Sequence, residues 1–497
     1  MSARDTTTAV AVRPEDERLS IGDNIIYGLQ HILSMFGGVI AVPLIVGGAA
    51  KLPGDQLALL VASAIFISGI ATVLQTVGVF TKTPFGFGSQ LPLVQGISFA
   101  SVSTLTSVIG KIGGVEGLRT ALGSTIVAGI VAFLIVPFFA QVIRFFPPVV
   151  TGSIITVIGL SLMPAAGRWI AAPTALNPAA GAASLVKDGK IVDNPAWGNP
   201  NYIAIALITL AITLGLSMIP KLARMAILLG LALGTIVAVI WQAIDPAAKM
   251  INTPNFGGKS ILAIPQPLAF GMPLFEIGAA ISMFIVLVVV MVETTADILA
   301  VGTVVGTEVD AHRVANGLRA DMLSCIVAPV FNTFPATAFA QNVGLVALSG
   351  IKSRWVVATG GAILAVLGLS PWLAEIIKSL PTPVLGGAGI VLFGMVAASG
   401  IRSLGKVNYD GNNNLLIVAV SIGFGLMPVV LPGFWHKLPN IVAVVLDSGI
   451  SSAAIVAFLL NIVFNVWGKG DKSTVHVTEA HAPARAVTAD DVEDLDK

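Results

Sequence analysis

The stretch GAAISMFIVLVVVMVETTADILAVG, from Gly278 to Gly302, decides the class of fold. Its apolar length matches the ~20 residues that a helix needs to cross a bilayer. Two carboxylates, Glu293 and Asp297, stand near its end, and a spacing of four residues places both on one helix face. A charge in hydrocarbon costs at least about 2.5 to 3.5 kcal/mol, so ionisable residues in spanning helices usually face a polar pathway. We therefore expect a binding site here.

The composition of the whole chain predicts a membrane protein that crosses the bilayer many times. Of 497 residues, only 11% are charged and 55% are hydrophobic, and the mean hydropathy is +0.92. A soluble domain carries about 25% charged residues. The net charge of +1 argues against a nucleic-acid partner. A single cysteine, Cys325, excludes an intramolecular disulfide and a thiolate metal cluster, so we predict no metal site and no cofactor.

Apolar runs divide the chain into twelve full spans and two shorter, interrupted segments. The full spans lie near 24–47, 57–80, 119–140, 148–165, 201–219, 223–243, 278–302, 314–331, 354–373, 383–400, 413–431 and 439–467. The interrupted segments run from Leu91 to Gly110 and from Phe334 to Gly350. They rank third and tenth of fourteen, the same place in each half if the chain divides as seven plus seven. Interrupted segments in matching places of two inverted halves indicate the central site of a secondary transporter.

An even number of spans places both termini on one side, and the positive-inside rule makes that side the cytoplasm. Short inner loops would then hold Lys82, Arg144, Lys221, Arg224, Arg313, Arg319, Lys352, Arg354, Arg402 and Lys406, against Lys51, Lys111, Arg119, Lys378 and Lys437 outside. The first twenty residues lack the apolar core of a cleavable signal. We expect a polar tail after residue 467, with His476 and His481 as solvated surface residues.

Prolines and glycines break the two short segments. Pro92 and Gly96 interrupt the first, which is expected to be extended up to Ser98, a favoured N-cap residue. Pro335 does the same in the second, with a helix restarting near Gln341 and Asn342. Two helix N-termini near mid-membrane would offer free N–H groups and positive dipole ends to a small polar solute.

The side chains near these breaks suit a nucleobase. Glu293 accepts hydrogen bonds, whereas Gln341 both donates and accepts, and together they match a planar ring with adjacent N–H and C=O groups. Phe99 is either a stacking platform for such a ring or simply a packing residue.

At this point the chain resembles the nucleobase-ascorbate transporters, also called the nucleobase/cation symporter-2 family. The family motif is Gln, Glu or Pro, then Asn, any residue, Gly, four of any kind, Thr, and Arg, Lys or Gly. Residues Gln341 to Gly350 match it, with Gly344 at the glycine and Ser349 in place of Thr. The resemblance also covers Gln30-His31, the QGISF stretch ending at Phe99, ETTADILAVG from Glu293, and the surroundings of Asp321.

The resemblance implies an all-α membrane fold of fourteen segments in two inverted seven-segment repeats, with segments 3 and 10 broken into an extended piece and a half-helix. It implies a core domain over 21–147 and 278–380 and a gate domain over 148–277 and 381–467. Tails would cover 1–20, cytoplasmic, and 468–497, cytoplasmic and disordered. It also implies a homodimer in the cell (inner) membrane.

By position in the matching stretches, Glu293, Gln341, Ser98, Phe99 and Asn342 resemble the family's substrate-binding residues. Asp297, Asp321, His31 and Gln30 resemble its polar network. Alternatives stay open for the network: Asp297 caps a helix or holds a proton, Asp321 takes part in the network or has a partly solvated structural role, and His31 packs or relays protons. For Asp447 we expect only a local contact at a helix end or in the gate.

Gln341 at the first motif position is typical of xanthine and uric acid carriers, whereas uracil permeases tend to carry Glu there. We therefore predict uptake of an oxidised purine coupled to protons by alternating access, with binding and protonation favouring each other. A uracil/proton symporter is the alternative, and an anion exchanger of the same general architecture is a further one. The chain contains no HExxH, GxSxG or P-loop, so we do not predict an enzyme.

Overall fold

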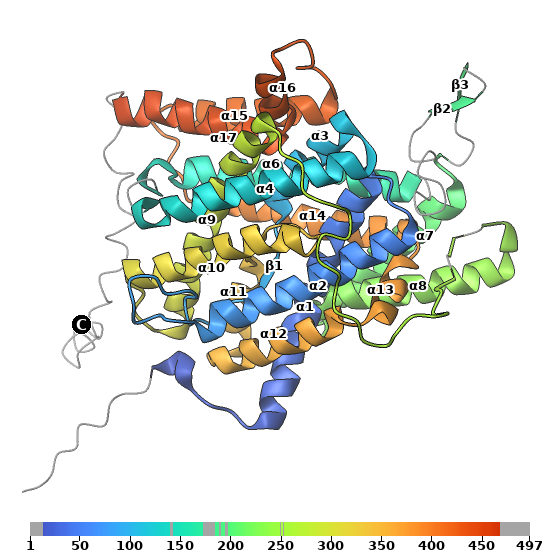
Figure 1. The fold of residues 1–497 in the computed structure, drawn as a ribbon, viewed down its shortest axis with the longest axis horizontal. Coiled ribbons are helices and arrows are strands. Elements are labelled where there is room, and N and C mark those ends of the chain that lie inside the picture. The colour runs from blue at the N-terminus through green and yellow to red at the C-terminus, as the bar shows by residue number, and fades with distance from the viewer. Residues whose placement is uncertain are drawn as a thin grey trace, which may run out of the picture.

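The computed structural model describes residues 13–139, 143–171, 184–187, 190–193, 197–248, 250–251 and 253–467, and this part of the chain is mostly helical (Figure 1). The helices of eight or more residues are α1 (Ile21–Ala49), α2 (Gly54–Val77), α3 (Val102–Ile112), α4 (Gly114–Ile135), α6 (Pro148–Ala171), α7 (Pro200–Ser217), α8 (Ala226–Ile244), α9 (Ile277–Val305), α10 (Ala311–Val330), α11 (Ala340–Ser349), α12 (Arg354–Gly368), α13 (Pro371–Lys378), α14 (Thr382–Leu404), α15 (Asn414–Val430), α16 (Asn440–Asp447) and α17 (Gly449–Asn461).

Short 3₁₀ turns and a π-helical end complete the helical segments: η1 (Pro14–Asp16), η2 (Phe99–Ser101), η3 (Val136–Phe138), η4 (Ile143–Phe145), η6 (Ala223–Met225), η7 (Pro246–Ala248) and η8 (Ile462–Trp467). The described part of the chain also forms four short strands: β1 (Gln95–Ile97), β2 (Ser184–Lys187), β3 (Lys190–Asp193) and β4 (Ala336–Ala338). Strands β2 and β3 form a separate antiparallel hairpin.

Nine helices within the described ranges are long and apolar enough to cross a membrane, or ten if the bent pair α12–α13 is one span. The chain is therefore a multi-pass membrane protein. The predicted span 314–331 corresponds to α10, whose Arg313, Arg319 and Asp321 keep it out of this set.

Two predicted spans are divided in the structure. The span expected over 354–373 splits into α12 and α13, which meet at 81°. Ser370 caps α13 by accepting a hydrogen bond from the backbone N–H of Leu373, and Pro371 is its first residue, so a new helix begins in a new direction. The span expected over 439–467 is interrupted at Ser448, which ends α16 and caps α17.

Small residues allow the helices to pack closely. A Cβ atom on Gly69 of α2 would lie 2.2 Å from the backbone nitrogen of Ala365 in α12, and one on Gly28 of α1 would lie 2.8 Å from that of Gly360. In the same way, a Cβ on Gly159 of α6 would lie 2.2 Å from the nitrogen of Ala397 in α14. Close backbone approach of this kind is how membrane helices gain packing energy.

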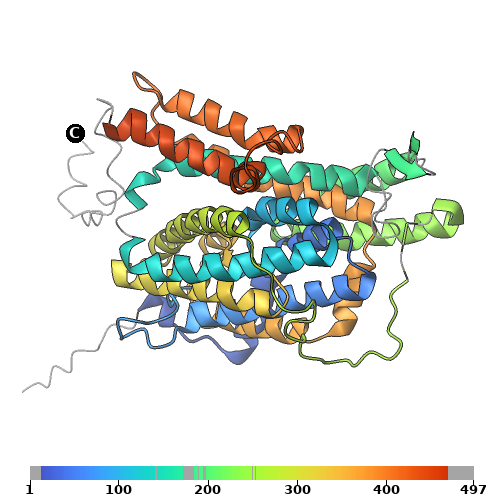
Figure 2. The same cartoon turned by 45° about the horizontal axis from the view of Figure 1, so that its top comes forward.

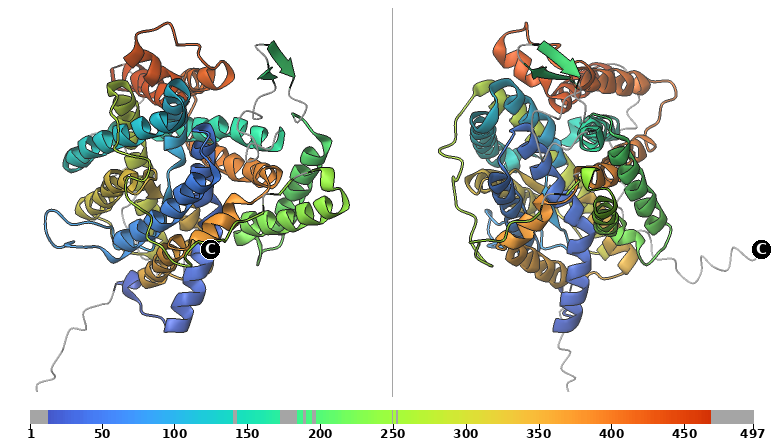
Figure 3. Two further views of the ribbon diagram at one scale, coloured as in Figure 1. Left: turned by 45° about the vertical axis from the view of Figure 1, so that its right-hand side comes forward. Right: turned by 90° about the vertical axis from the view of Figure 1, so that its right-hand side faces the viewer.

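The helices gather into two groups. The first consists of α6, α7, α8, α14, α15 and α17 and is joined by the packing of α6 on α14. Helices α15 and α17 pack on each other and on α6, and Figure 2 shows them along one side of the molecule. Helices α7 and α8 lie side by side at another edge, where α7 and α8 both pack on α14 (Figure 3). Helices α1, α2, α4, α9, α10 and α12 pack among themselves around β1 and β4.

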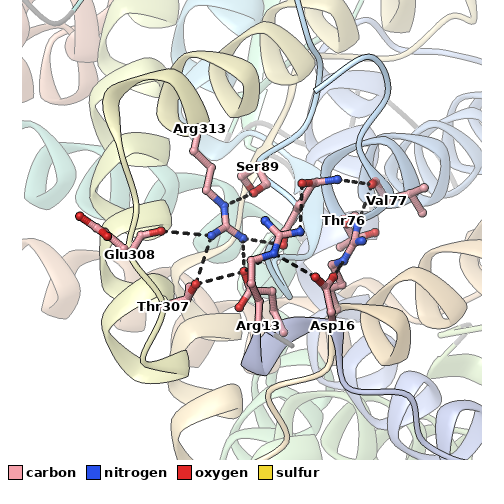
Figure 4. Close-up of polar contacts among 11 residues, drawn as sticks. Arg13, Asp16, Thr76, Val77, Ser89, Thr307, Glu308 and Arg313 are labelled. Carbon is pink, nitrogen blue, oxygen red and sulfur yellow. Dashed lines mark hydrogen bonds and ion pairs between the residues drawn. The ribbon is translucent and has the colours of Figure 1, made fainter. Parts of the chain in front are cut away.

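Residues 13–17, which the sequence assigns to the N-terminal tail, fold back onto the bundle (Figure 4). Glu15 is fully buried and accepts a hydrogen bond of 2.6 Å from Arg313 of α10. Asp16 pairs with Arg354 of α12 at 2.7 Å, and Arg354 also donates to the backbone oxygens of the last turn of α2. The C-terminal tail with His476 and His481 lies outside the described residues.

Candidate substrate site

Two three-residue strands meet in the interior of the bundle. Strand β1 pairs with β4 in antiparallel register, with Gln95 opposite Ala338 and Ile97 opposite Ala336. The N–H of Ser98 donates to Pro335, and that of Phe339 donates to Val94, so the ladder continues at both ends. All six strand residues are buried. Pairing is necessary here because an unpaired backbone group in hydrocarbon costs several kcal/mol.

A helix follows each strand. Chain order in β1 leads through the turn η2 into α3, and chain order in β4 leads into α11. Because the strands are antiparallel, the two helices begin at opposite ends of the short ladder and leave in opposite directions. Ser98 is extended and stands at the N-cap position of η2, as expected, although its hydroxyl makes no capping hydrogen bond.

Aromatic rings pack beside this ladder. Phe99 and Phe339 are stacked, with centroids 6.0 Å apart and planes inclined by 16°. Phe393 of α14 meets the Phe99 ring edge-on at 6.1 Å. A Cβ on Gly96 would lie 2.3 Å from the Phe339 ring, so only glycine admits the ring at this place. Phe99 thus belongs to a stacked aromatic pair, whose second ring the sequence analysis did not identify.

Glu293 carries a carboxylate without a partner. It lies in the second half of α9, and it makes no hydrogen bond or ion pair with any residue that the structure describes. The alternative of a structural ion pair, which would make Glu293 part of the scaffold, therefore finds no support in this geometry.

Gln341 is the second residue of α11, the helix that packs against α9. Its half-buried amide also has no hydrogen-bond partner among the described residues. The two predicted binding side chains therefore lie on two adjacent helices with their polar groups unused.

His31 and Asn342 are joined directly. The Nδ1 atom of His31 in α1 lies 2.8 Å from Oδ1 of Asn342, and the Asn342 amide donates to the backbone oxygen of Pro92 at 2.7 Å. Because Oδ1 can only accept, the hydrogen is on Nδ1 of His31. Asn342 therefore links α1 and α11 to the segment before β1. Gln30, which precedes His31 in α1, is half-buried and makes no side-chain hydrogen bond within the described residues.

Asp321 lies inside the bundle. It is 1% exposed in the middle of α10, so of the two alternatives for Asp321 the partly solvated structural role is wrong. The hydroxyl of Thr294 donates to its carboxylate at 2.5 Å and lies 3.1 Å from the hydroxyl of Thr337 in β4. Arg319 does not pair with Asp321 and instead donates to Asn316.

Several buried polar atoms near the ladder have no partner in the described part of the chain. They are the Ser98 hydroxyl, both polar atoms of the Gln95 amide, one carboxylate oxygen of Asp297 and one of Asp321. Buried polar groups are almost always hydrogen-bonded, so a group of orphans needs an explanation. Gln95 was not among the predicted site residues, although it opens the QGISF stretch, and its polarity inside a broken segment was the available signal.

The glycine and serine of the motif have local roles in α11. Gly344 is exposed, and a Cβ there would meet nothing within 4 Å, so packing does not require glycine. The Ser349 hydroxyl accepts from the N–H of Ile351 at the end of α11, where Gly350 takes a positive φ of 69°. Asp447 is the last residue of α16, so it lies at a helix end, but one of its carboxylate oxygens is unpartnered among the described residues and the expected local contact stays a prediction.

Comparisons with known proteins identify purine permeases as relatives of this chain. The chain is 38% identical to the "Uric acid transporter UacT" of Escherichia coli (strain K12) over 462 residues, 91% of this chain and 89% of the relative. It is 37% identical to the "Xanthine permease" of Bacillus subtilis (strain 168) over 457 residues, 92% of this chain and 97% of the relative.

Solved structures share the fold at low identity. The transmembrane domain of the cyanobacterial bicarbonate transporter BicA aligns with a TM-score of 0.55 at 18% identity, covering 87% of this chain and 97% of that one. Murine Slc26a9, an anion transporter in the inward-facing state, aligns with a TM-score of 0.58 at 15% identity, covering 90% and 69%.

The family assignment rests on nearly the whole membrane region. Residues 22–434 match the family model Xan_ur_permease, described as "Permease family". The family and the relatives are permeases, so the protein is a transporter and not an enzyme. The chain belongs to the nucleobase/cation symporter-2 family.

Proposed function

We propose that this protein takes up an oxidised purine, xanthine or uric acid, together with protons. The observation that carries the proposal is the carboxylate of Glu293, which has no partner among the described residues and lies on a membrane helix packed against α11, the helix of Gln341. A side chain of this type in a spanning segment marks a substrate or ion pathway. The names of the relatives, a uric acid transporter and a xanthine permease, support the substrate class.

Each site residue has a role in this proposal. Glu293 accepts a ring N–H, and Gln341 pairs with a neighbouring C=O and N–H edge. The Phe99 and Phe339 pair supplies an apolar wall for the purine face. Backbone and hydroxyl groups at Ser98 complete the pocket, and Asn342 acts through its bonds to His31 and Pro92, which position the start of α11.

In this proposal, the coupled proton binds to one of three carboxylates, those of Glu293, Asp297 and Asp321. Glu293 and Asp297 are one helical turn apart, and one oxygen of Asp297 and one of Asp321 lack partners within the described ranges. Uncompensated negative charge in a buried site is costly, and a bound proton removes it. Protonation also removes repulsion against a purine that carries partial negative charge, so proton and substrate bind with mutual assistance.

Alternating access follows from an arrangement of fourteen segments in two inverted repeats. The segments are α1, α2, β1–α3, α4, α6, α7 and α8, followed by α9, α10, β4–α11, α12–α13, α14, α15 and α16–α17.

The packing of these helices has the symmetry that inverted repeats require. The pair α1–α12 corresponds to α9–α4, the pair α2–α12 to α10–α4, and the pair α7–α8 to α15–α17, and all six packings occur. Strands β1 and β4 correspond to each other and pair antiparallel. Helices α6 and α14 also correspond to each other, and they pack together.

The core domain comprises 21–147 and 278–380, and the gate domain comprises 148–277 and 381–467. The polar contacts that join them include the following two sets. On one side, Thr104 of α3 lies 2.7 Å from the Ser448 hydroxyl, and Ser282 of α9 lies 2.9 Å from that of Ser451. On the other, Arg224 donates to the backbone oxygen of Leu348 near the end of α11. These contacts form and break as the site is exposed to alternate sides.

The assembly and placement follow the family pattern. We expect a homodimer in the cell membrane with both termini in the cytoplasm, because the short loops on that side hold more Lys and Arg.

Uptake of radiolabelled xanthine and urate tests the function. Cells that express the full chain should accumulate at least one of the two purines, and a proton uncoupler should abolish accumulation. Unlabelled uracil, sulfate and ascorbate serve as competitors. Accumulation that survives the uncoupler contradicts proton coupling, and stronger competition by uracil or sulfate contradicts the purine assignment.

The variant Glu293→Gln tests the site. It retains the size of the side chain but cannot ionise or carry the coupled proton, so proton-driven accumulation should fall by about 10- to 100-fold, as expected when a charge-assisted hydrogen bond of ~1.5 to 3 kcal/mol is lost. Glu308→Gln, at an exposed position just after the same helix, is the matched control and should transport normally. Wild-type uptake in Glu293→Gln would refute the assignment.

A further inference from the structure

An open groove of about 490 Å³ lies at the end of the bundle where α1 begins, α2 ends and α12 begins. Its polar end is formed by Arg18, Asn24 and Trp355, and its apolar wall by Val73 and Val77 of α2 with Ala358 and Ala362 of α12. It does not include the residues of the substrate site. The first turns of α1 project beyond the neighbouring helices beside it (Figure 3).

The apolar wall continues along the membrane helices. In α2, Ile70, Val73 and Val77 follow at steps of three and four residues, so they share one helix face. In α12, Ala362 and Val366 share a face in the same way. Ile70 is 47% exposed and Val366 is 57% exposed, so this apolar track is uncovered by the rest of the described chain.

The polar end carries a free positive charge. The Arg18 guanidinium lies 5.6 Å from the centre of the Trp355 ring, and it makes no hydrogen bond or ion pair within the described residues. The adjacent Arg354 is different, since Asp16 neutralises it at 2.7 Å. The nearest carboxylate in α1, that of Asp23, is hydrogen-bonded by the Ser20 hydroxyl.

We propose that this groove binds an anionic phospholipid of the surrounding membrane. The phosphate pairs with Arg18, and one acyl chain lies along the track between Val77 and Val366. Basic pockets between membrane helices bind anionic head groups, and tryptophan is enriched at the depth where head groups lie. A purine is a poorer fit, because the Trp355 ring already stands against two guanidinium groups, those of Arg18 and Arg354.

Native mass spectrometry of the full chain tests the site with two lipids, phosphatidylglycerol and phosphatidylcholine. The wild type should retain phosphatidylglycerol with about fivefold preference. Arg18→Gln should remove that preference, since one basic residue near a membrane surface contributes ~1 kcal/mol, or about fivefold in affinity. Ala362→Trp fills the exposed track and should weaken binding of both lipids.

Matched variants separate this groove from general lipid contact. Arg402→Gln removes an exposed arginine from the end of α14, and Ala211→Trp adds a ring to an exposed face of α7, so neither should change lipid retention. Equal effects of Arg18→Gln and Arg402→Gln would overturn the proposal, as would equal retention of both lipids by the wild type. Displacement of the lipid by added xanthine would identify a purine site instead and would also overturn it.

Discussion

His31 of α1 and Asn342 of α11 are held 2.8 Å apart by one hydrogen bond, and the same asparagine binds the backbone oxygen of Pro92. One amide therefore connects a long membrane helix, a short helix and the chain that enters β1. Since Gln341 directly precedes Asn342, this connection fixes the position of the proposed purine-binding amide of Gln341.

Asn342→Ala should destabilise the protein and impair uptake. The change leaves the Nδ1–H of His31 and the Pro92 oxygen unpaired in a buried place, at a cost of roughly 1 to 3 kcal/mol for each group. A lower melting temperature of the purified protein and slower xanthine uptake are the expected results. The control Asn413→Ala removes an exposed amide that makes no capping bond at α15, and it should leave both values unchanged. An unaltered melting temperature in Asn342→Ala would show that the bond is dispensable.

Gly96→Ala and Gly344→Ala should behave in opposite ways. A methyl on Gly96 would lie 2.3 Å from the Phe339 ring, so it displaces the ring from its stack with Phe99 and should reduce both stability and uptake. A methyl on Gly344 meets nothing, and alanine is up to ~1 kcal/mol better than glycine inside a helix. Gly344→Ala should therefore be at least as stable as the wild type. Thermal unfolding and uptake of the two variants, measured together, check this difference.

A disulfide between α9 and α17 should stop transport. The hydroxyls of Ser282 and Ser451 are 2.9 Å apart, and the only native cysteine, Cys325, is buried. Oxidation of the double variant Ser282→Cys, Ser451→Cys should arrest uptake if the two helices separate in each cycle, and a reductant should restore it. The two single variants under the same oxidant are the controls. Full uptake by a protein that is cross-linked on gels would exclude separation at this contact.

The N-terminal ion pair should give stability a dependence on acid. Burial acts to raise the pKa of Asp16, but hydrogen bonds and charges from Arg354 and Arg13 outweigh it and hold the pKa below its usual value of 3.8. A lowered carboxyl pKa in the folded state stabilises the protein above the unfolded value, and this stabilisation is lost as the pH falls through the folded value.

The melting temperature of the wild type should thus fall below about pH 3.8 more steeply than that of Asp16→Asn. The variant should also melt at a lower temperature at neutral pH, because Arg354 is only 7% exposed and loses its carboxylate partner. Parallel curves for the two proteins across pH 5 to 3 would contradict the assignment of this acid dependence to Asp16.

Hydropathy predicted the long helices well because a bilayer imposes their length. The expected spans 57–80 and 278–302 correspond to α2 and α9 within a few residues at each end. The turn at Pro371 was also present in the sequence, as a serine cap followed by proline, but a search for apolar length runs across it. Hydropathy is likewise insensitive to the interruption at Ser448, where no proline occurs.

The parts that depend on distant partners were beyond sequence reasoning. Glu15 is buried against Arg313, 298 residues away, and a mixed-charge segment gives no sign of such a partner. The pairing of β1 with β4 and the stacking of Phe339 on Phe99 are equally remote in the chain. The preceding Arg319 was the reason for the alternative of a partly solvated Asp321, yet the two side chains have different partners in the fold.

The ladder between β1 and β4 also has a consequence for biosynthesis. About 240 residues separate the two strands, so at roughly 5 to 20 residues per second the ribosome needs about 12 to 48 s to produce the second strand after the first. During that time the backbone groups of β1 that pair with β4 lack these partners, and acyl chains offer them none, whereas Thr72 of α2 already accepts from the Gln95 backbone amide. The nascent chain must therefore remain shielded at the insertion machinery until its second half emerges, which makes insertion of the two halves a single, coupled event.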